Sequence, residues 1–181
     1  MKLLVAIVVI LAVGGNTLDI IPITEWAGSE INRKQELANP VNMVVIQHTA
    51  SKDCYSDKLC LQTVNNIRGY VMKIGFDDIP YSFMVGGNGK VYEGAGWHRV
   101  GAHTKGYNDK AIGIGFIGTF VEKLPSPEAL KAAQELIEYG VQNNHIAGDY
   151  KLFGHRQLSS TVSPGDALQK EIEGWPHWAK N

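Results

Sequence analysis

Three histidines, His48, His103 and His155, are the side chains best suited to chemistry, because imidazoles bind metals and exchange protons near neutral pH. Each lies beside a predicted strand end or in a loop, where functional residues of α/β proteins collect. No two of them have the four-residue spacing of a zinc-binding helix, and spacing alone indicates no third strong ligand. The histidines therefore suggest a site but leave its chemistry open.

A second motif consists of Gly113, Gly115 and Gly118, whose spacing matches the G-x-G-x-x-G dinucleotide fingerprint. That fingerprint places its glycines between a strand and a helix. Here the glycines lie inside a strand pattern that is followed by Lys-Leu-Pro at 123–125. The motif thus disfavours nucleotide binding and instead predicts a strand with a glycine face that another backbone or a ligand can approach closely.

Hydrophobic patterning predicts the elements that must position these residues. The β-branched run at 43–46 predicts a central strand buried on both faces. Apolar residues at spacings of three and four predict an amphipathic helix over 57–74, capped by Asp57 and ended by Gly75. The remaining predictions are a hairpin of 81–85 and 90–93, a strand at 112–120, a helix from Ser126, a strand at 150–153, and a closing helix opened by 163–166.

Length and charge limit the class of protein. The chain has 181 residues with 44% hydrophobic content, which suits one compact α/β or α+β domain. Its formal net charge of -1 gives no sign of the basic surface that nucleic-acid binding requires. We therefore expect a single domain and no nucleic-acid partner.

The first residues have the pattern of a secretory signal peptide. Met1 and Lys2 are followed by an apolar run at 3–13 and then by two glycines. A buried strand and a membrane anchor are the alternatives, but an anchor needs about 20 apolar residues. We predict a signal peptide over 1–15, a mature domain over 16–181, secretion to the extracellular space and no membrane partner.

The only two cysteines, Cys54 and Cys60, are expected to form a disulfide if the chain is exported. An oxidising compartment favours a disulfide over free thiols or a metal-binding pair. The loop that it would close is very small, so its expected role is to hold the loop at 51–57 against the following helix.

A family resemblance runs along the chain from about Ile23 to Trp178, and five segments carry most of it. They are Val-Val-Ile-Gln-His-Thr-Ala at 44–50, Val-Tyr-Glu-Gly-Ala-Gly-Trp at 91–97, Gly-Ala-His-Thr at 101–104, Gly-His-Arg at 154–156 and Glu-Gly-Trp-Pro-His-Trp at 173–178. The chain resembles peptidoglycan recognition proteins, above all the short secreted insect members. The resemblance implies an α/β fold with a single mixed β-sheet flanked by helices, shared with phage-type amidase lysozymes. It also implies a groove for muramic acid and its stem peptide.

The resemblance identifies three positions that hold zinc in the catalytic members. The ligands there are a histidine at the first strand's end, a histidine in the Gly-His-Arg segment and a cysteine eight residues later, and this chain has Gln47, His155 and Ser163 instead. An amide is a poor zinc ligand, and a serine hydroxyl would have to ionise to replace a thiolate. His48 cannot substitute for Gln47, because neighbouring strand residues point to opposite faces. We therefore expect no zinc, no other cofactor and no catalysis.

Three of the retained or changed residues also have a role that does not depend on zinc. Ser163 followed by Pro164 suits a helix N-cap, so the argument against zinc depends mainly on Gln47. Tyr81 and Thr161 match the residues that assist the metal-bound water or the substrate carbonyl in the amidases. Without a metal, we expect them to form the groove wall and to hydrogen-bond the ligand.

The family positions also predict the ligand-binding residues. Trp97 is equally suited to the core, and Arg99 could pair with the extra carboxylate of diaminopimelic acid. The predicted set is His48, Thr49, Tyr81, Trp97, His98, Arg99, His103, Tyr107, His155 and Thr161.

The resemblance implies a secreted pattern-recognition protein of innate immunity. It would bind bacterial peptidoglycan without cleaving it and signal through an immune-cascade protein partner. The alternatives are a zinc-dependent N-acetylmuramoyl-L-alanine amidase that uses other ligands, and a carbohydrate-binding or adaptor module without peptide specificity. The preference between lysine-type and diaminopimelate-type peptidoglycan stays open.

Overall fold

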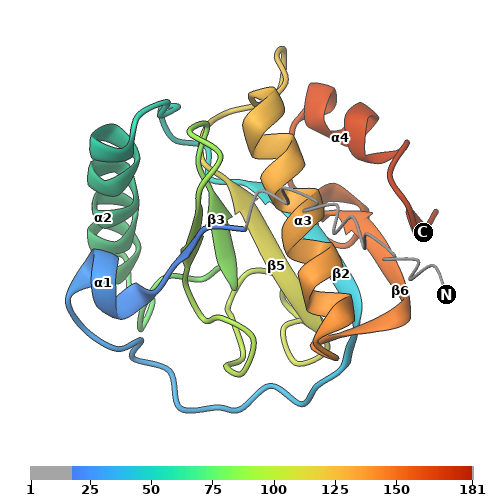
Figure 1. The fold of residues 1–181 in the computed structure, drawn as a ribbon, viewed down its shortest axis with the longest axis horizontal. Coiled ribbons are helices and arrows are strands. Elements are labelled where there is room, and N and C mark those ends of the chain that lie inside the picture. Colours follow the sequence, from blue (N-terminus) through green and yellow to red (C-terminus); the bar gives the residue numbers. More distant parts are fainter. Residues whose placement is uncertain (1–17, 181) are drawn as a thin grey trace, which may run out of the picture.

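The computed structural model describes residues 18–180, and its centre is one six-stranded mixed β-sheet (Figure 1). The strand order is β1-β4-β3-β5-β2-β6, and among these neighbours only β3 and β4 run antiparallel. This arrangement confirms the predicted single mixed sheet. The strands are β1 (Ile20–Ile21), β2 (Val41–His48), β3 (Phe83–Val85), β4 (Val91–Glu93), β5 (Ala111–Phe116) and β6 (Ile146–Gly154).

Strand β2 comes from the β-branched run of the sequence and lies between β5 and β6. Val44, Val45 and Ile46 are fully buried, as expected for a strand covered on both faces. It is the strand next to one edge of the sheet, not its centre. Strand β5 is shorter than predicted and ends at Phe116, because Gly118 adopts a positive φ of 143° and turns the chain away.

Helices cover both faces of the sheet (Figure 1). The residues of α3 and α4 share one apolar cluster with Ile46 and Ile114, whereas those of α1 and α2 share another with Met84 and Tyr92. The sheet therefore separates two cores. The helices are α1 (Ile23–Ala27), α2 (Asp57–Lys73), α3 (Pro127–Gln142), the short 3-10 helix η1 (His155–Gln157) and α4 (Asp166–Ile172).

The helix caps confirm one prediction and correct two. Ser126 caps α3 as predicted, because its hydroxyl accepts a hydrogen bond from the Ala129 N–H at 3.1 Å. The prediction that Asp57 caps α2 is wrong, since Ser56 is the N-cap residue. The prediction that Ser163 caps the last helix is also wrong, because α4 begins after Gly165.

Cys54 and Cys60 form the predicted disulfide, with Cα atoms 5.0 Å apart. Both are fully buried and pack in the cluster beneath α2, so the bridge joins the loop after β2 to the first turn of that helix. The predicted signal peptide at 1–15 lies outside the described residues. Across residues 18–180, none of the helices has the length and apolar character needed to span a bilayer.

Candidate functional site

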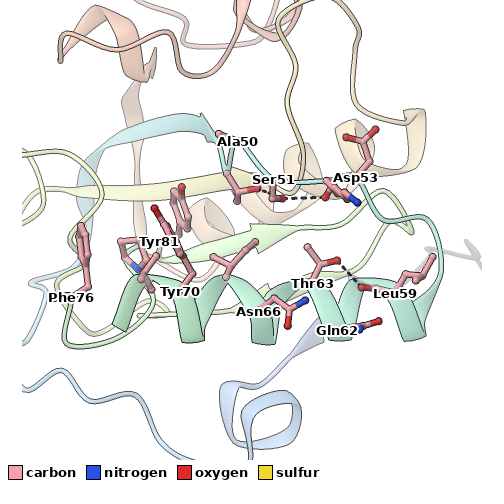
Figure 2. A pocket seen from close by; sticks show the side chains of 15 residues that line it. Ala50, Ser51, Asp53, Leu59, Gln62, Thr63, Asn66, Tyr70, Phe76 and Tyr81 are labelled. Carbon is pink, nitrogen blue, oxygen red and sulfur yellow. Dashed lines mark hydrogen bonds between the residues drawn. The ribbon is translucent and has the colours of Figure 1, made fainter. Parts of the chain in front are cut away.

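A pocket of about 730 Å³ lies between helix α2 and the loop that follows strand β2 (Figure 2). Figure 2 shows α2 along one side of the pocket and the loop at 50–53 along the other. Thr49 and Tyr81 are the members of the predicted ligand-binding set that line it. Such a volume is typical of ligand sites, which usually measure about 300–1,000 Å³.

The α2 wall of the pocket is a stripe of residues spaced by three and four positions. Thr63, Asn66 and Tyr70 are lining residues on the helix side of the pocket (Figure 2). Their stripe neighbours the buried stripe of Cys60, Val64 and Val71 that holds the helix on the sheet. The helix therefore has two functions, packing on one face and lining the pocket on the next. The residues that line the pocket are Thr49, Ala50, Ser51, Lys52, Asp53, Leu59, Gln62, Thr63, Asn66, Ile67, Tyr70, Val71, Phe76, Pro80 and Tyr81.

One end of the pocket is charged. Asp53 accepts hydrogen bonds from Tyr55 at 2.9 Å and from Lys123, which also forms an ion pair with it. Burial opposes ionisation of Asp53, but these two donors outweigh it and lower its pKa. Lys52 adds an exposed cation to the same end. The opposite end, at Tyr70, Phe76 and Tyr81, is aromatic.

Beside the pocket, the glycine face of β5 makes room for two rings. A Cβ atom on Gly115 would lie 2.9 Å from the ring of Tyr81, and one on Gly113 would lie 2.4 Å from the ring of His103. Gln47 pairs with Gly115 across the parallel strands and shares that face. The predicted close approach to the glycine face is thus made by two side chains of the same protein.

Gln47 is buried and its amide is committed to hydrogen bonds. Its Nε2 donates to the His103 carbonyl oxygen at 3.0 Å and to the Thr104 hydroxyl at 2.9 Å. Burial lowers the pKa of His103 to about 4, so its imidazole is neutral at physiological pH. Burial also raises the pKa of Tyr81 to about 12, and its hydroxyl donates to the His48 carbonyl oxygen at 3.4 Å. These groups form a polar layer under the pocket that is neutral near pH 7.

Gln47, His155 and Ser163, which the resemblance matches to the zinc positions of the amidases, lie near the ends of β2 and β6. Ile46 pairs with Gly154, which sets His155 beside Gln47. The Ser163 hydroxyl accepts a hydrogen bond from the His48 N–H at 3.1 Å, and the Ser163 N–H donates to the Thr161 hydroxyl at 3.2 Å. Burial and the nearby His48 lower the pKa of His155.

This donor set does not fit a zinc ion. Gln47 offers only a neutral amide oxygen, which is a poor zinc ligand, and Ser163 offers a hydroxyl that already accepts a backbone N–H. His155 is the one strong zinc ligand among the three, whereas protein zinc sites need three or four. In the described part of the chain, no three His, Cys, Asp or Glu side chains are grouped to hold a metal.

The other predicted ligand-binding residues do not line the pocket. His48 lies on the opposite face of β2, where its Nδ1 accepts a hydrogen bond from the Phe120 N–H at 3.3 Å. The rings of Trp97 and His145 stack 4.7 Å apart, and His98 contacts the same histidine, near the first residue of β2. This is the end of the strand away from the pocket.

The last two predicted residues have partners outside the pocket as well. Arg99 pairs with Glu36 at 3.3 Å, and Lys110 lies over the ring of Tyr107 at 4.9 Å. Sequence reasoning missed Thr104, Asp53 and the pocket-facing stripe of α2. The stripe does have a sequence signal, because its mixed polar and aromatic residues recur at helical spacing beside the buried positions.

A family model, sequence relatives and solved structures all indicate the same family. Residues 37–166 match the N-acetylmuramoyl-L-alanine amidase family. The chain is 48% identical over 158 residues to a peptidoglycan recognition protein of Trichoplusia ni, covering 87% of each protein. It matches a chain in the crystal structure of tracheal cytotoxin bound to the ectodomain complex of peptidoglycan recognition proteins LCa and LCx, with 47% identity and a TM-score of 0.86 over 89% of this chain and 98% of that one.

Another similar structure is that of peptidoglycan recognition protein LE in complex with tracheal cytotoxin, a monomeric diaminopimelic acid-type peptidoglycan. The identity is 40% and the TM-score 0.86, and the match covers 89% of this chain and 96% of that one. Sequence identity, coverage and fold agree along nearly the whole described domain. The chain belongs to the peptidoglycan recognition protein family, on the amidase fold.

Proposed function

We propose that this protein binds bacterial peptidoglycan in the pocket between α2 and the loop after β2, and that it does not cleave it. The observation that carries the proposal is the combination of an intact pocket with a donor set unsuited to zinc. Support also comes from the two similar structures that hold tracheal cytotoxin.

The pocket lining suits a polar glycopeptide. The aromatic end, with Tyr70 and Tyr81, offers flat surfaces to a sugar ring or an apolar peptide side chain. Thr63 and Asn66 offer hydrogen bonds along the middle of the pocket. Of the residues expected from the sequence, Thr49 and Tyr81 are proposed as direct contacts, with His155 and Thr161 at the adjoining end of β6.

The proposed lack of cleavage follows from the chemistry of the donors. In the amidase reaction a zinc ion acidifies a water molecule and polarises the amide carbonyl. Gln47 and Ser163 cannot supply the imidazole and thiolate that would hold this ion. Tyr81 and Thr161 can still hydrogen-bond a ligand, but a tyrosine whose pKa is raised to about 12 is a weak acid that cannot replace a Lewis acid.

Secretion and signalling complete the proposal. The signal-peptide pattern at 1–15 supports export, and the disulfide between Cys54 and Cys60 suits an oxidising compartment. Transfer of the signal to an immune-cascade protein is proposed from the family resemblance.

The test incubates purified protein with muropeptides, and measures binding, released stem peptide and bound zinc together. We expect saturable binding, no released peptide and less than stoichiometric zinc. Tyr70→Ala should weaken binding about tenfold, which corresponds to about 1.4 kcal/mol. Tyr139→Ala, which removes an exposed tyrosine from α3, is the matched control and should bind as the wild type does.

A double variant tests the identification of the former zinc positions. Gln47→His with Ser163→Cys restores the ligand types of the catalytic members and should bind one zinc ion. Stoichiometric zinc and peptide release by the wild-type protein would overturn the proposal. Failure of the double variant to bind zinc would mean that the three positions are misidentified.

A further inference from the structure

The pocket wall at 49–53 is connected to a segment that lies outside the pocket. This segment, residues 118–123, belongs to the loop between β5 and α3, and we name it the brace. The described residues that line the pocket all lie within 49–81. The brace therefore contacts the wall from the side that faces away from the ligand.

Two hydroxyl groups of the wall are hydrogen-bonded to the first residues of the brace. The Gly118 N–H donates to the Thr49 hydroxyl at 3.1 Å, and the Thr119 hydroxyl donates to the Ser51 carbonyl oxygen at 3.2 Å. The Thr49 and Ser51 hydroxyl oxygens lie 2.8 Å apart, and the Ser51 hydroxyl donates to the Lys52 carbonyl oxygen at 3.1 Å. Because a hydroxyl has one hydrogen, Thr49 must be the donor to Ser51. The hydrogen bonds thus run in one direction from the brace into the wall.

Asp53 makes the third link, at the charged end of the pocket. Its carboxylate forms an ion pair with Lys123 and accepts a hydrogen bond from Tyr55 at 2.9 Å. The carboxylate also lies against the backbone of the brace, because a Cβ atom on Gly118 would come within 2.6 Å of its Oδ1. Together with the links at 49 and 51, every second residue of the wall contacts the brace.

The wall is fixed at its two ends by other means. The Thr49 N–H donates to the Phe116 carbonyl oxygen at 2.9 Å, which extends the pairing of β2 with β5. The disulfide of Cys54 and Cys60 joins the residue after the wall to α2. A wall that is already ordered spares the ligand the entropy cost of ordering it on binding.

We propose that the brace holds the wall at its distance from α2, so that Lys123 and Thr119 are positioning residues for peptidoglycan binding. This inference rests on the proposed function of the pocket. Lys123→Met and Thr119→Val each remove one link and keep the size of the side chain. Each should weaken muropeptide binding about three- to tenfold, because the loosened wall must then be ordered by the ligand.

Two control variants accompany them. Lys123→Arg keeps the charge and should restore wild-type affinity. Lys131→Met breaks a pair with Glu135 on α3, 3.1 Å long, and the two lysines are similarly exposed. It should bind as the wild type does. Melting temperatures of all variants should stay within about 2–4 °C of the wild type, since exposed ion pairs contribute little to stability.

A double variant separates positioning from direct contact, because Asp53 itself lines the pocket. If its carboxylate acts through Lys123, Asp53→Asn combined with Lys123→Met should bind no more weakly than Asp53→Asn alone. Losses that add up in the double variant would mean that Asp53 contacts the ligand and that Lys123 does not act through it.

Hydrogen exchange of the free protein tests the brace without any ligand. Amides of 50–54 should exchange several-fold faster in Lys123→Met and Thr119→Val than in the wild type, and at the wild-type rate in Lys131→Met. Unchanged exchange would overturn the brace, and faster exchange with unchanged affinity would overturn its positioning role. Absence of muropeptide binding by the wild type would contradict the proposed function instead, and the exchange rates would still show whether the brace holds the wall.

Discussion

The two faces of the β2–β5 strand pair share one backbone, but one face is apolar and the other is polar. On the face toward α3, Ile46 and Ile114 are neighbours in register and are fully buried. On the other face, Gln47 is the neighbour of Gly115, and the rings of Tyr81 and His103 occupy the space that the glycines leave. The first face provides the hydrophobic stability of the domain. The second holds a buried polar layer beside the pocket, and this layer contains groups whose protonation depends on pH.

The largest expected effect comes from breaking the apolar face. Ile114→Ala removes a fully buried side chain from the core beneath α3, and should lower the free energy of unfolding by about 3–4 kcal/mol. Urea denaturation measures this loss. The variant that remains folded should bind muropeptides with wild-type affinity, since Ile114 faces away from the pocket. A large fall in affinity with little loss of stability would contradict the division between the faces.

The next effect concerns pH and the polar face. The pKa of His103 is lowered to about 4 by burial, below its ordinary value of 6.5, so the unfolded chain binds the proton more tightly. The contribution of neutral His103 to the free energy of unfolding is therefore fully present above pH 6.5, and it is lost as the pH falls from 6.5 to about 4. The loss should approach about 3 kcal/mol.

The matched variant for this test is His103→Phe, which keeps a ring over Gly113. His48 and His155 remain in both proteins, so their titrations cancel in the comparison. Denaturation curves measured between pH 7 and pH 4 give the free energy of unfolding at each pH. The slope of that free energy against pH should be smaller for the variant than for the wild type. Equal slopes would mean that His103 is not the buried neutral group described above.

The smallest expected effect tests how tightly the glycine face of β5 is packed. Gly113→Ala places a methyl group 2.4 Å from the His103 ring, and the crowding should destabilise the fold by about 2 kcal/mol. It should also weaken muropeptide binding through the displaced polar layer. Gly148→Ala is the control, because a Cβ there has no heavy atom within 4 Å. Equal stability of the two variants would show that the glycine face is not tightly packed.

Local patterns in the sequence predicted the elements better than the contacts between them. The run at 43–46 and the cap at Ser126 depend on neighbouring residues and were confirmed. Ser163 also looked like a cap, but its hydroxyl bonds the His48 N–H, a partner distant in sequence. A propensity rule describes a residue's neighbours and cannot include such a partner.

The candidate site was predictable only in part, for the same reason. The family resemblance identified Gln47, His155 and Ser163, and the fold brings these positions together at adjoining strand ends. Tyr81 and Thr49 line the pocket, whereas Trp97 packs at the far end of β2. An aromatic residue in a loop has no periodic pattern to indicate its direction, so the packing of the whole domain decides it.

The strand order bears on how the protein comes to be folded. Strand β2 lies early in the sequence, but its two partners in the sheet, β5 and β6, both come much later. Pairing between distant segments is slow, and the apolar β2 has no neighbour until most of the domain has been synthesised. The polar layer around Gln47 needs His103 and Thr104 and the glycine face of β5, which all come after β4 in the sequence. The residues that line the pocket at 49–81 thus precede in the sequence the strands β5 and β6 that complete the sheet behind them.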